Sequence, residues 1–405
     1  MKHFSWAFWL WMAVCYPQLR TQTLEWGFFG HRKINKMAIF TLPEEMLPLY
    51  KNNLEYLEEH AVDPDKRRYA TPFEAIRHYI DLDQWGVPPH PNLPRDWNSA
   101  LALHSQLHLI TETGDTLVFH FQKANADTFC IHPGGHCISV SDYHRFFRKN
   151  ILPQYFNDEW QCAPDTISKY LKLPLQGALC FWKDTLSAHG ILPYYLPIAL
   201  EKLSRAFADK NKDRILQYSA EIGHYIGDAH VPLHTTKNYN GQLTGQYGIH
   251  AFWESRLPEL FADEEYDFFA GKADYIKDPQ SFFWKIVYDS HQLLPAVLEG
   301  EKWLSETFPK DNQFCYDERL GQTVRIQCRE YARAYHDQMR GMVEERMRNA
   351  IQAIGSAWYT AWVNAGQPDL TQIDMNNGSS APEKEPDQKK AGANIKVREH
   401  EDGNK

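Results

Sequence analysis

Long hydrophobic runs and an excess of positive charge are both missing from this chain. Apart from one apolar segment at residues 4–16, no stretch approaches the roughly 18 consecutive apolar residues that a membrane-spanning helix needs. The chain has 43 Lys and Arg against 52 Asp and Glu, a formal net charge of −9. We therefore expect no binding to duplex DNA, and nothing in the sequence indicates a stable protein partner.

Strand-like alternation is scarce too, and residues 116–121 are its best example. Apolar residues instead recur at spacings of three and four across residues 196–228 and 324–363, and no internal repeat is found. These patterns predict an all-α fold in one compact domain, from residue 26 to about 365. Residues 366–405 are polar, which is typical of a disordered tail.

The apolar segment at residues 4–16 follows Lys2 and is too short to span a bilayer. A basic start followed by a short apolar core is typical of a signal peptide, although a buried N-terminal helix is the alternative. We interpret residues 1–25 as a signal peptide and predict export, to the periplasm or outside the cell. An uncleaved segment would instead anchor the protein at its N-terminus.

The cysteines fit an exported protein. One of the seven, Cys15, lies in the signal segment, and the other six allow up to three disulfides whose pairing the sequence does not fix. Cys130 and Cys137 flank the stretch His132-Pro-Gly-Gly-His136, which fits either a small metal site or a disulfide across a tight turn. We favour the disulfide, because the metal ligands would be crowded into one turn.

Histidine is abundant, with 19 residues, and five of the metal-binding candidates fall within 31 residues. His224 and Asp228 are spaced i, i+4, which places both on one helical face, and His250 and Glu254 repeat this spacing. His234 lies between the two pairs. One such pair is weak evidence, but two pairs with an intervening histidine favour a site for Zn²⁺, which accepts histidine and carboxylate ligands.

Further candidates lie upstream, and with them the set resembles a known superfamily. The ordered residues are Trp26, His31, Asp63, His78, His224, Asp228, His234, His250 and Glu254. This set is similar to that of the zinc-dependent phospholipases C and the fungal single-strand-specific zinc nucleases S-one and P-one. The resemblance implies an all-α, multi-helix fold with three zinc ions at the base of a cleft.

The resemblance also implies how the ligands divide. Asp63, His78 and His224 would hold one zinc ion, and Asp228 would bridge it to a second. The second would take His31 together with the α-amino nitrogen and carbonyl oxygen of Trp26, which requires cleavage after residue 25. The third would be held by His234, His250 and Glu254.

The implied activity is zinc-dependent hydrolysis of phosphoric esters. Asp81, three residues after His78, is the candidate general base, and Lys66 or Arg67 could bind phosphate oxygens. We slightly favour phospholipase C-type cleavage of phospholipids. The alternative is a single-strand nuclease and 3′-nucleotidase that releases 5′-nucleotides. A further alternative, from another functional class, is a binding protein that zinc stabilises and that has no catalytic activity.

The interval between His78 and His224 is long for this superfamily. Residues of about 86–190 therefore constitute an insertion within the domain, and it carries four of the six remaining cysteines. Its pair His104 and His108 matches no expected ligand, and we interpret both as structural.

Overall fold

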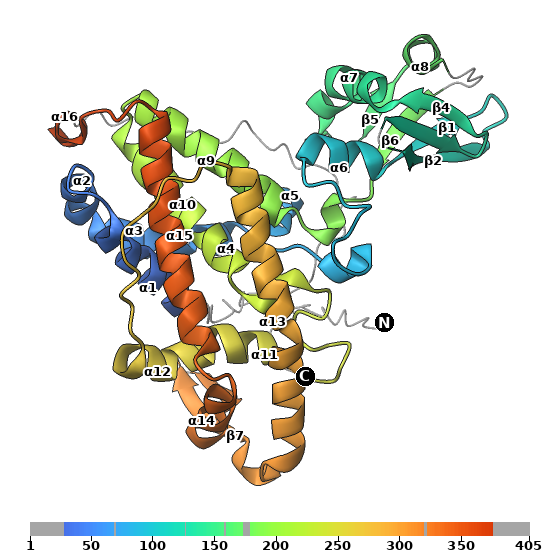
Figure 1. Ribbon diagram of the computed structural model, residues 1–405. Helices are drawn as coiled ribbons and strands as arrows, with labels where there is room; N and C mark the ends of the chain where they lie inside the picture. Colours follow the sequence, from blue (N-terminus) through green and yellow to red (C-terminus); the bar gives the residue numbers. More distant parts are fainter. Residues whose placement is uncertain are drawn as a thin grey trace, which may run out of the picture.

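The computed structural model describes residues 28–68, 70–125, 127–157, 159–172, 179–319 and 322–375. Within them the chain forms a helical body and a separate lobe that contains a β-sheet (Figure 1). We call residues 86–190 the insertion and the remaining described residues the helical body. None of the described helices is both long and apolar enough to cross a membrane.

The helical body is built on five helices that pack against one another. They are α1 (Phe28–Ala38), α9 (Leu192–Ala208), α10 (Lys212–Ala229), α13 (Pro279–Thr307) and α15 (Met342–Asn364). Asn211 caps α10 by accepting a hydrogen bond from the backbone N–H of Arg214, and Asp278 caps α13 in the same way at Ser281. The second half of α10 is buried on all sides, which places it at the centre of the bundle.

Shorter helices complete the body and carry several of the candidate site residues. The α-helices are α2 (Leu47–Asn52), α3 (Leu54–Glu59), α4 (Asp63–Arg67), α5 (Pro72–Ala75), α11 (Ile249–Ala251), α12 (Leu257–Glu265), α14 (Arg329–Gln338) and α16 (Leu370–Met375). The 3-10 helices are η1 (Ile39–Thr41), η2 (His60–Val62), η3 (Ile76–His78), η4 (Leu82–Trp85), η7 (Pro232–Thr235) and η9 (Lys310–Asn312), and η8 (Phe252–Arg256) is a π-helix.

The prediction of an all-α fold is wrong, because the insertion folds around a six-stranded antiparallel sheet. The strand order is β4-β3-β2-β1-β6-β5. The strands are β1 (Ser105–Ile110), β2 (Thr116–Asn125), β3 (Thr128–His132), β4 (His136–Ser139), β5 (Trp160–Cys162) and β6 (Leu179–Asp184). The helices are α6 (Trp97–Leu103), α7 (Val140–Asn150) and α8 (Pro164–Leu171), with short 3-10 turns η5 (Leu152–Gln154) and η6 (Ser187–His189). The protein is therefore mixed α and β.

The sheet was not predicted, because the alternation of apolar and polar residues in its strands is short and its outer face is polar. In β1, Leu107 and Leu109 are buried, whereas Gln106 and His108, which alternate with them, lie on the other face. The segment 116–121, which alone showed alternation, begins β2. Strands of this length give too few repeats for the pattern to stand out against the helical periodicity.

Two disulfides are present among the described cysteines. Cys130 and Cys137 lie directly opposite each other on β3 and β4 and are bonded, so the expectation of a disulfide there is confirmed. Cys315 and Cys328 close a second antiparallel pair, β7 (Phe314–Arg319) and β8 (Gln322–Gln327).

The chain after residue 365 differs in part from the expected disordered tail. Helix α16 buries Leu370 and Ile373 against the body. Two apolar side chains within an otherwise polar stretch were too few to predict this packing. Residues 376–405, like residues 1–27, lie outside the described residues.

Candidate metal centre

The site begins where α1 crosses α10, and two glycines allow that crossing. A Cβ atom at Gly223 would lie 2.0 Å from Oδ1 of Asn35, and one at Gly227 would lie 2.9 Å from Nδ1 of His31. Because both positions lack a side chain, the two helices approach closely. The ring of His31 consequently stacks on that of His224, with 3.9 Å between the ring centroids.

One group of ligand atoms forms around His224 and His78. Nε2 of His224 lies 3.1 Å from Nδ1 of His78, and Oδ1 of Asp65 lies 3.6 Å from each of these nitrogens. Both histidines are completely buried. His224 comes from α10, His78 from the end of η3 and Asp65 from α4, so three separate elements converge on one point.

Asp228, one turn after His224 on α10, reaches two groups of ligands at once. Its Oδ2 lies 2.9 Å from Nδ1 of His78, and its Oδ1 lies 3.5 Å from Nε2 of His31. The carboxylate is 1% exposed. A buried carboxylate with both oxygens directed at histidine nitrogens is suited to bridging two cations.

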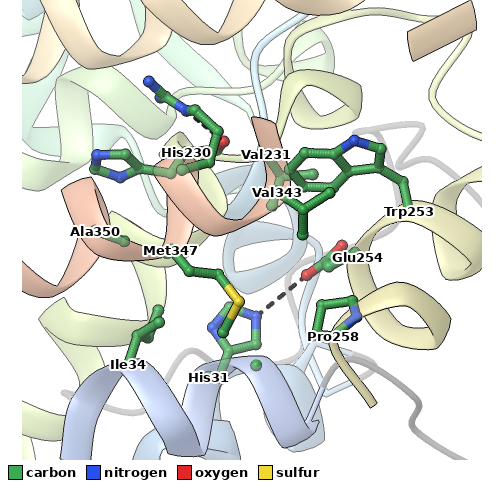
Figure 2. A pocket seen from close by; sticks show the side chains of 13 residues that line it. His31, Ile34, His230, Val231, Trp253, Glu254, Pro258, Val343, Met347 and Ala350 are labelled. Atoms are coloured by element: carbon green, nitrogen blue, oxygen red, sulfur yellow. Dashed lines mark hydrogen bonds and ion pairs between the residues drawn. The ribbon is translucent and has the colours of Figure 1, made fainter. Parts of the chain in front are cut away.

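A third group is formed by His234, His250 and Glu254. Oε2 of Glu254 lies 2.7 Å from Nε2 of His250 and 3.2 Å from Nε2 of His234, and the two histidine nitrogens are 3.0 Å apart. The other carboxylate oxygen of Glu254 lies 3.4 Å from Nε2 of His31 (Figure 2). Glu254 therefore also contacts His31, which lies outside the third group.

Backbone carbonyls fix which nitrogen of two histidines faces inward. Nδ1 of His224 donates to the carbonyl of Ala61 at 2.9 Å, and Nδ1 of His234 donates to the carbonyl of His78. In each ring this hydrogen bond holds a proton on Nδ1, so Nε2 is the nitrogen that faces into the site and would bind a metal ion once it has lost its own proton.

The carboxylates of the site strongly influence its histidines. Burial lowers the pKa of His224, but Asp228 and Asp65 outweigh it and raise the pKa to about 9. The pKa of His234 is also raised to about 9, because Asp228 and Glu254 outweigh burial. Burial opposes ionisation of Asp228, yet His224 and His234 hold its pKa well below its usual range. The site thus favours bound positive charge.

These contacts define three groups of ligands that can each hold a metal ion. The first cluster is His31, His224 and Asp228, the second is Asp65, His78 and His224, and the third is His234, His250 and Glu254. Within each cluster the ligand atoms lie within 4.8 Å of one another. The mixed nitrogen and oxygen donors fit Zn²⁺ and other first-row transition metals better than Ca²⁺ or Mg²⁺, which prefer oxygen alone.

Asp65, and not the predicted Asp63, lies among the ligands of the second cluster. Asp63 accepts hydrogen bonds from His60, at 2.5 Å, and from Lys66, at 2.9 Å, and it belongs to none of the clusters. The two aspartates are the first and third residues of α4, so they point to different sides of the helix. The sequence does not show which side of this five-residue helix faces the site.

The phosphate-binding candidates also lie differently from the expectation. Lys66 pairs with Asp63, and Nη1 of Arg67 bonds to Glu221 at 2.8 Å. Arg68, which sequence reasoning passed over, places Nη1 3.7 Å from Oδ1 of Asp65. A cation three residues after a ligand on a short helix was the signal that would have identified it.

Asp81 lies next to the clusters without belonging to them. Its Oδ2 is 3.6 Å from Nδ1 of His189, and its backbone N–H donates to the carbonyl of the same residue at 2.7 Å. The preceding residue, Ile80, donates its backbone N–H to the carbonyl of His234 at 2.9 Å. His189, from the end of the insertion, was not among the predicted site residues.

Glu74 is a further residue that sequence reasoning missed. Its carboxylate accepts hydrogen bonds from Arg77, at 2.8 Å, and from the hydroxyl of Tyr225, and one oxygen lies 3.9 Å from Nε2 of His78. Glu74 therefore supports His78 on the side away from the clusters. Trp26, the remaining predicted ligand, lies outside the described residues.

A small cavity adjoins the centre on the side of His31 (Figure 2). Its volume is about 40 Å³, and apolar side chains such as Val231, Trp253 and Met347 form much of its wall. This space holds one or two water molecules and no substrate. The ligands that retain some exposure are Asp65, His250 and Glu254, at 21%, 12% and 13% of the side chain, so solvent reaches the clusters from their side.

With the geometry described, the chain was compared with known proteins. No family model matches the sequence, and no curated protein matches it.

Proposed function

We propose that this protein is an exported, zinc-dependent phosphoester hydrolase with three zinc ions, and that it favours phospholipase C-type cleavage of phospholipids. The observation that carries the proposal is the continuity of the three clusters. His224 belongs to two of them, and Asp228 and Glu254 each contact histidines of two groups. Adjacent metal sites of this kind are typical of enzymes that hydrolyse phosphate esters.

The residues present fit zinc on chemical grounds. The first and second clusters share His224 and together offer five protein ligands, and the third cluster offers three, which leaves coordination positions for water or substrate. When bound, the zinc ions would lower the pKa of a water molecule and neutralise charge on the phosphoryl group. A purely structural zinc site would more often be closed by four protein ligands, and this favours catalysis over a zinc-stabilised binding protein.

The chain itself supplies orientation and proton transfer in this proposal. The carbonyls of Ala61 and His78 hold His224 and His234 with Nε2 directed inward. Asp81 would accept a proton at its carboxylate, and His189 would hold that carboxylate in position. Arg68, close to Asp65, would bind a phosphate oxygen in place of Lys66 or Arg67.

The proposal includes export and a free amino group at Trp26. Two disulfides are compatible with an oxidising compartment, although they argue for it only weakly. Intact mass of the active protein should show a chain that begins at residue 26. An active protein that retains residues upstream would overturn the role of Trp26 as a ligand.

The test is a ³¹P NMR product analysis combined with metal determination. Purified protein with zinc is incubated with phosphatidylcholine vesicles and a single-stranded oligonucleotide in the same tube. We expect phosphocholine to appear and the signal to be lost after chelation. Nucleoside 5′-monophosphates would show the nuclease alternative instead. Bound zinc without either product would overturn the hydrolase proposal and favour a binding protein.

A further inference from the structure

A second cavity lies between the insertion and the helical body, away from the three clusters. Its volume is about 780 Å³, which is within the usual range for small-molecule sites. Trp97, Leu152 and Phe156 of the insertion line one side, and α9 and the start of α10 line the other. The cavity therefore exists only because the insertion is present.

Apolar and aromatic side chains form most of the wall. Trp97 and Tyr194 lie with their ring centroids 5.5 Å apart, and Phe73 and Phe156 with theirs 5.2 Å apart, so rings from both regions meet there. Phe156 is 52% exposed and Ile198 is 39% exposed, although both are large hydrophobic residues. A wall of this kind, left open to solvent, favours an apolar ligand.

The charged groups of the cavity are mainly positive. Four of its lining residues are cationic and one is acidic: Arg77, Lys202, Arg205, Arg214 and Asp209. Lys202 and Arg205 lie in the last two turns of α9, where Arg205 pairs with Glu201, and Arg214 lies in the first turn of α10. Nearer the rings, the guanidinium of Arg77 and the ammonium of Lys202 lie 4.4 Å and 5.7 Å from the ring centroid of Tyr195.

None of the lining residues belongs to the three clusters. The nearest connection runs through Arg77, which bonds to Glu74 at 2.8 Å, and Glu74 lies 3.9 Å from Nε2 of His78. Occupation of the cavity is thus chemically independent of metal binding.

We propose that this cavity binds an amphipathic anion, with a single acyl chain against the aromatic wall and a carboxylate or phosphate head group at the cations of the α9–α10 turn. The wall accounts for the chain, because aromatic and aliphatic side chains from two regions enclose it. The excess of cations accounts for the head group. The proposal goes beyond the hydrolase function and does not depend on it.

The test uses the full chain and the fluorescent probe 11-(dansylamino)undecanoic acid. We expect saturable enhancement of probe fluorescence, displaced by dodecanoate or dodecyl phosphate but not by dodecanol or inorganic phosphate. The better competitor of the first two identifies the head group. Shortening the competitor by two methylene groups should weaken displacement about 15-fold, if the chain is buried. Displacement that does not depend on the chain length of the competitor would overturn the proposal.

Variants locate the probe. Ile198→Asp and Lys202→Glu should each weaken probe binding by about tenfold or more, through the wall and the head group respectively. Phe269→Ala and Arg145→Glu change exposed residues outside the cavity and should leave binding unchanged. Circular dichroism shows whether each variant is folded.

The same titration is repeated after treatment with a chelator. Binding should persist, because no metal ligand lines the cavity. Loss of binding with the metals, or wild-type binding by both cavity variants, would show that the probe sits elsewhere and would overturn the proposal. Retained probe binding by a protein without hydrolase activity would refute only the proposed function.

Discussion

The histidines of the metal centre and those of the insertion's sheet lie in different surroundings. In the body, His78, His224 and His234 are buried with their nitrogens directed at carboxylates and at one another. In the insertion, His108 stacks on Phe181 with 4.9 Å between ring centroids, and His136 bonds to the carbonyl of Leu171. Histidine spacing alone is therefore weak evidence for a metal site. The histidines of the metal centre differ from those of the sheet because carboxylates lie close to their ring nitrogens.

The strongest test of this contrast removes one histidine from each region. His224→Ala deletes a ligand shared by two clusters, so bound zinc should fall by up to two ions and hydrolysis by roughly 1,000-fold or more. His108→Ala, in the sheet, should change neither. Metal analysis and the ³¹P assay measure both effects. Equal zinc content in the two variants would contradict the assignment of the clusters.

A second test addresses the packing that brings the body's histidines together. Gly223→Ala places a Cβ atom 2.0 Å from Oδ1 of Asn35, so α1 must shift and the protein should lose about 1–3 kcal/mol of stability. Zinc affinity should fall too, because His31 lies on α1. Gly30→Ala on α1 is the matched control, since a Cβ atom there would lie 3.7 Å from the carbonyl oxygen of Glu254, an ordinary contact distance. Urea denaturation compares the two variants, and similar losses would argue against close helix packing as the cause.

A third test perturbs the insertion alone. Replacing Cys130 and Cys137 by serine opens a loop with a sequence separation of 7, which should destabilise the lobe by about 2 kcal/mol. Hydrogen exchange should increase within residues 105–184 while zinc content stays unchanged. If zinc were lost as well, the two regions would be more tightly coupled than their separate ligands indicate.

The smallest expected effect is a change in how stability depends on pH. His224 and His234 have pKa values of about 9 in the folded protein against 6.5 as the ordinary value. After chelation, the stability that they contribute is fully present below pH 6.5 and is lost as the pH rises through about 9. With excess zinc the slope should reverse, because zinc requires unprotonated imidazole. Urea midpoints at pH 6.5, 7.5 and 9 measure both slopes, and equal slopes would contradict the assignment.

The sequence predicted those parts of the site in which two ligands lie four residues apart, on α10 and across the α11–η8 segment. His224 with Asp228 and His250 with Glu254 follow directly from the i, i+4 rule, because one helical turn brings each pair together. Asp65 was missed, since α4 has only five residues and the sequence does not define which of its faces turns inward. Residues such as Glu74 and His189 are joined to the site only by tertiary packing, which local spacing does not encode.

The long helices of the body were predicted, whereas the strands of the insertion and the β7–β8 pair of the body were not, for a related reason. Long helices repeat their apolar pattern many times, whereas β5 has three residues and β4 has four. The order β4-β3-β2-β1-β6-β5 places β6 beside β1 although more than 60 residues separate them, and a local pattern carries no information about such pairing.

The two ends of the insertion leave and re-enter the body at almost the same place. Asp81 bonds to His189 through the backbone, and Leu192 donates its backbone N–H to the carbonyl of Tyr79 at 3.1 Å. Between them, Gly190 has a φ of +85°, and a Cβ there would lie 2.1 Å from that carbonyl. Because its ends already meet, the lobe between them is free to be lengthened, shortened or exchanged in evolution without repositioning the metal ligands. A change in the lobe would thus leave the three clusters unchanged.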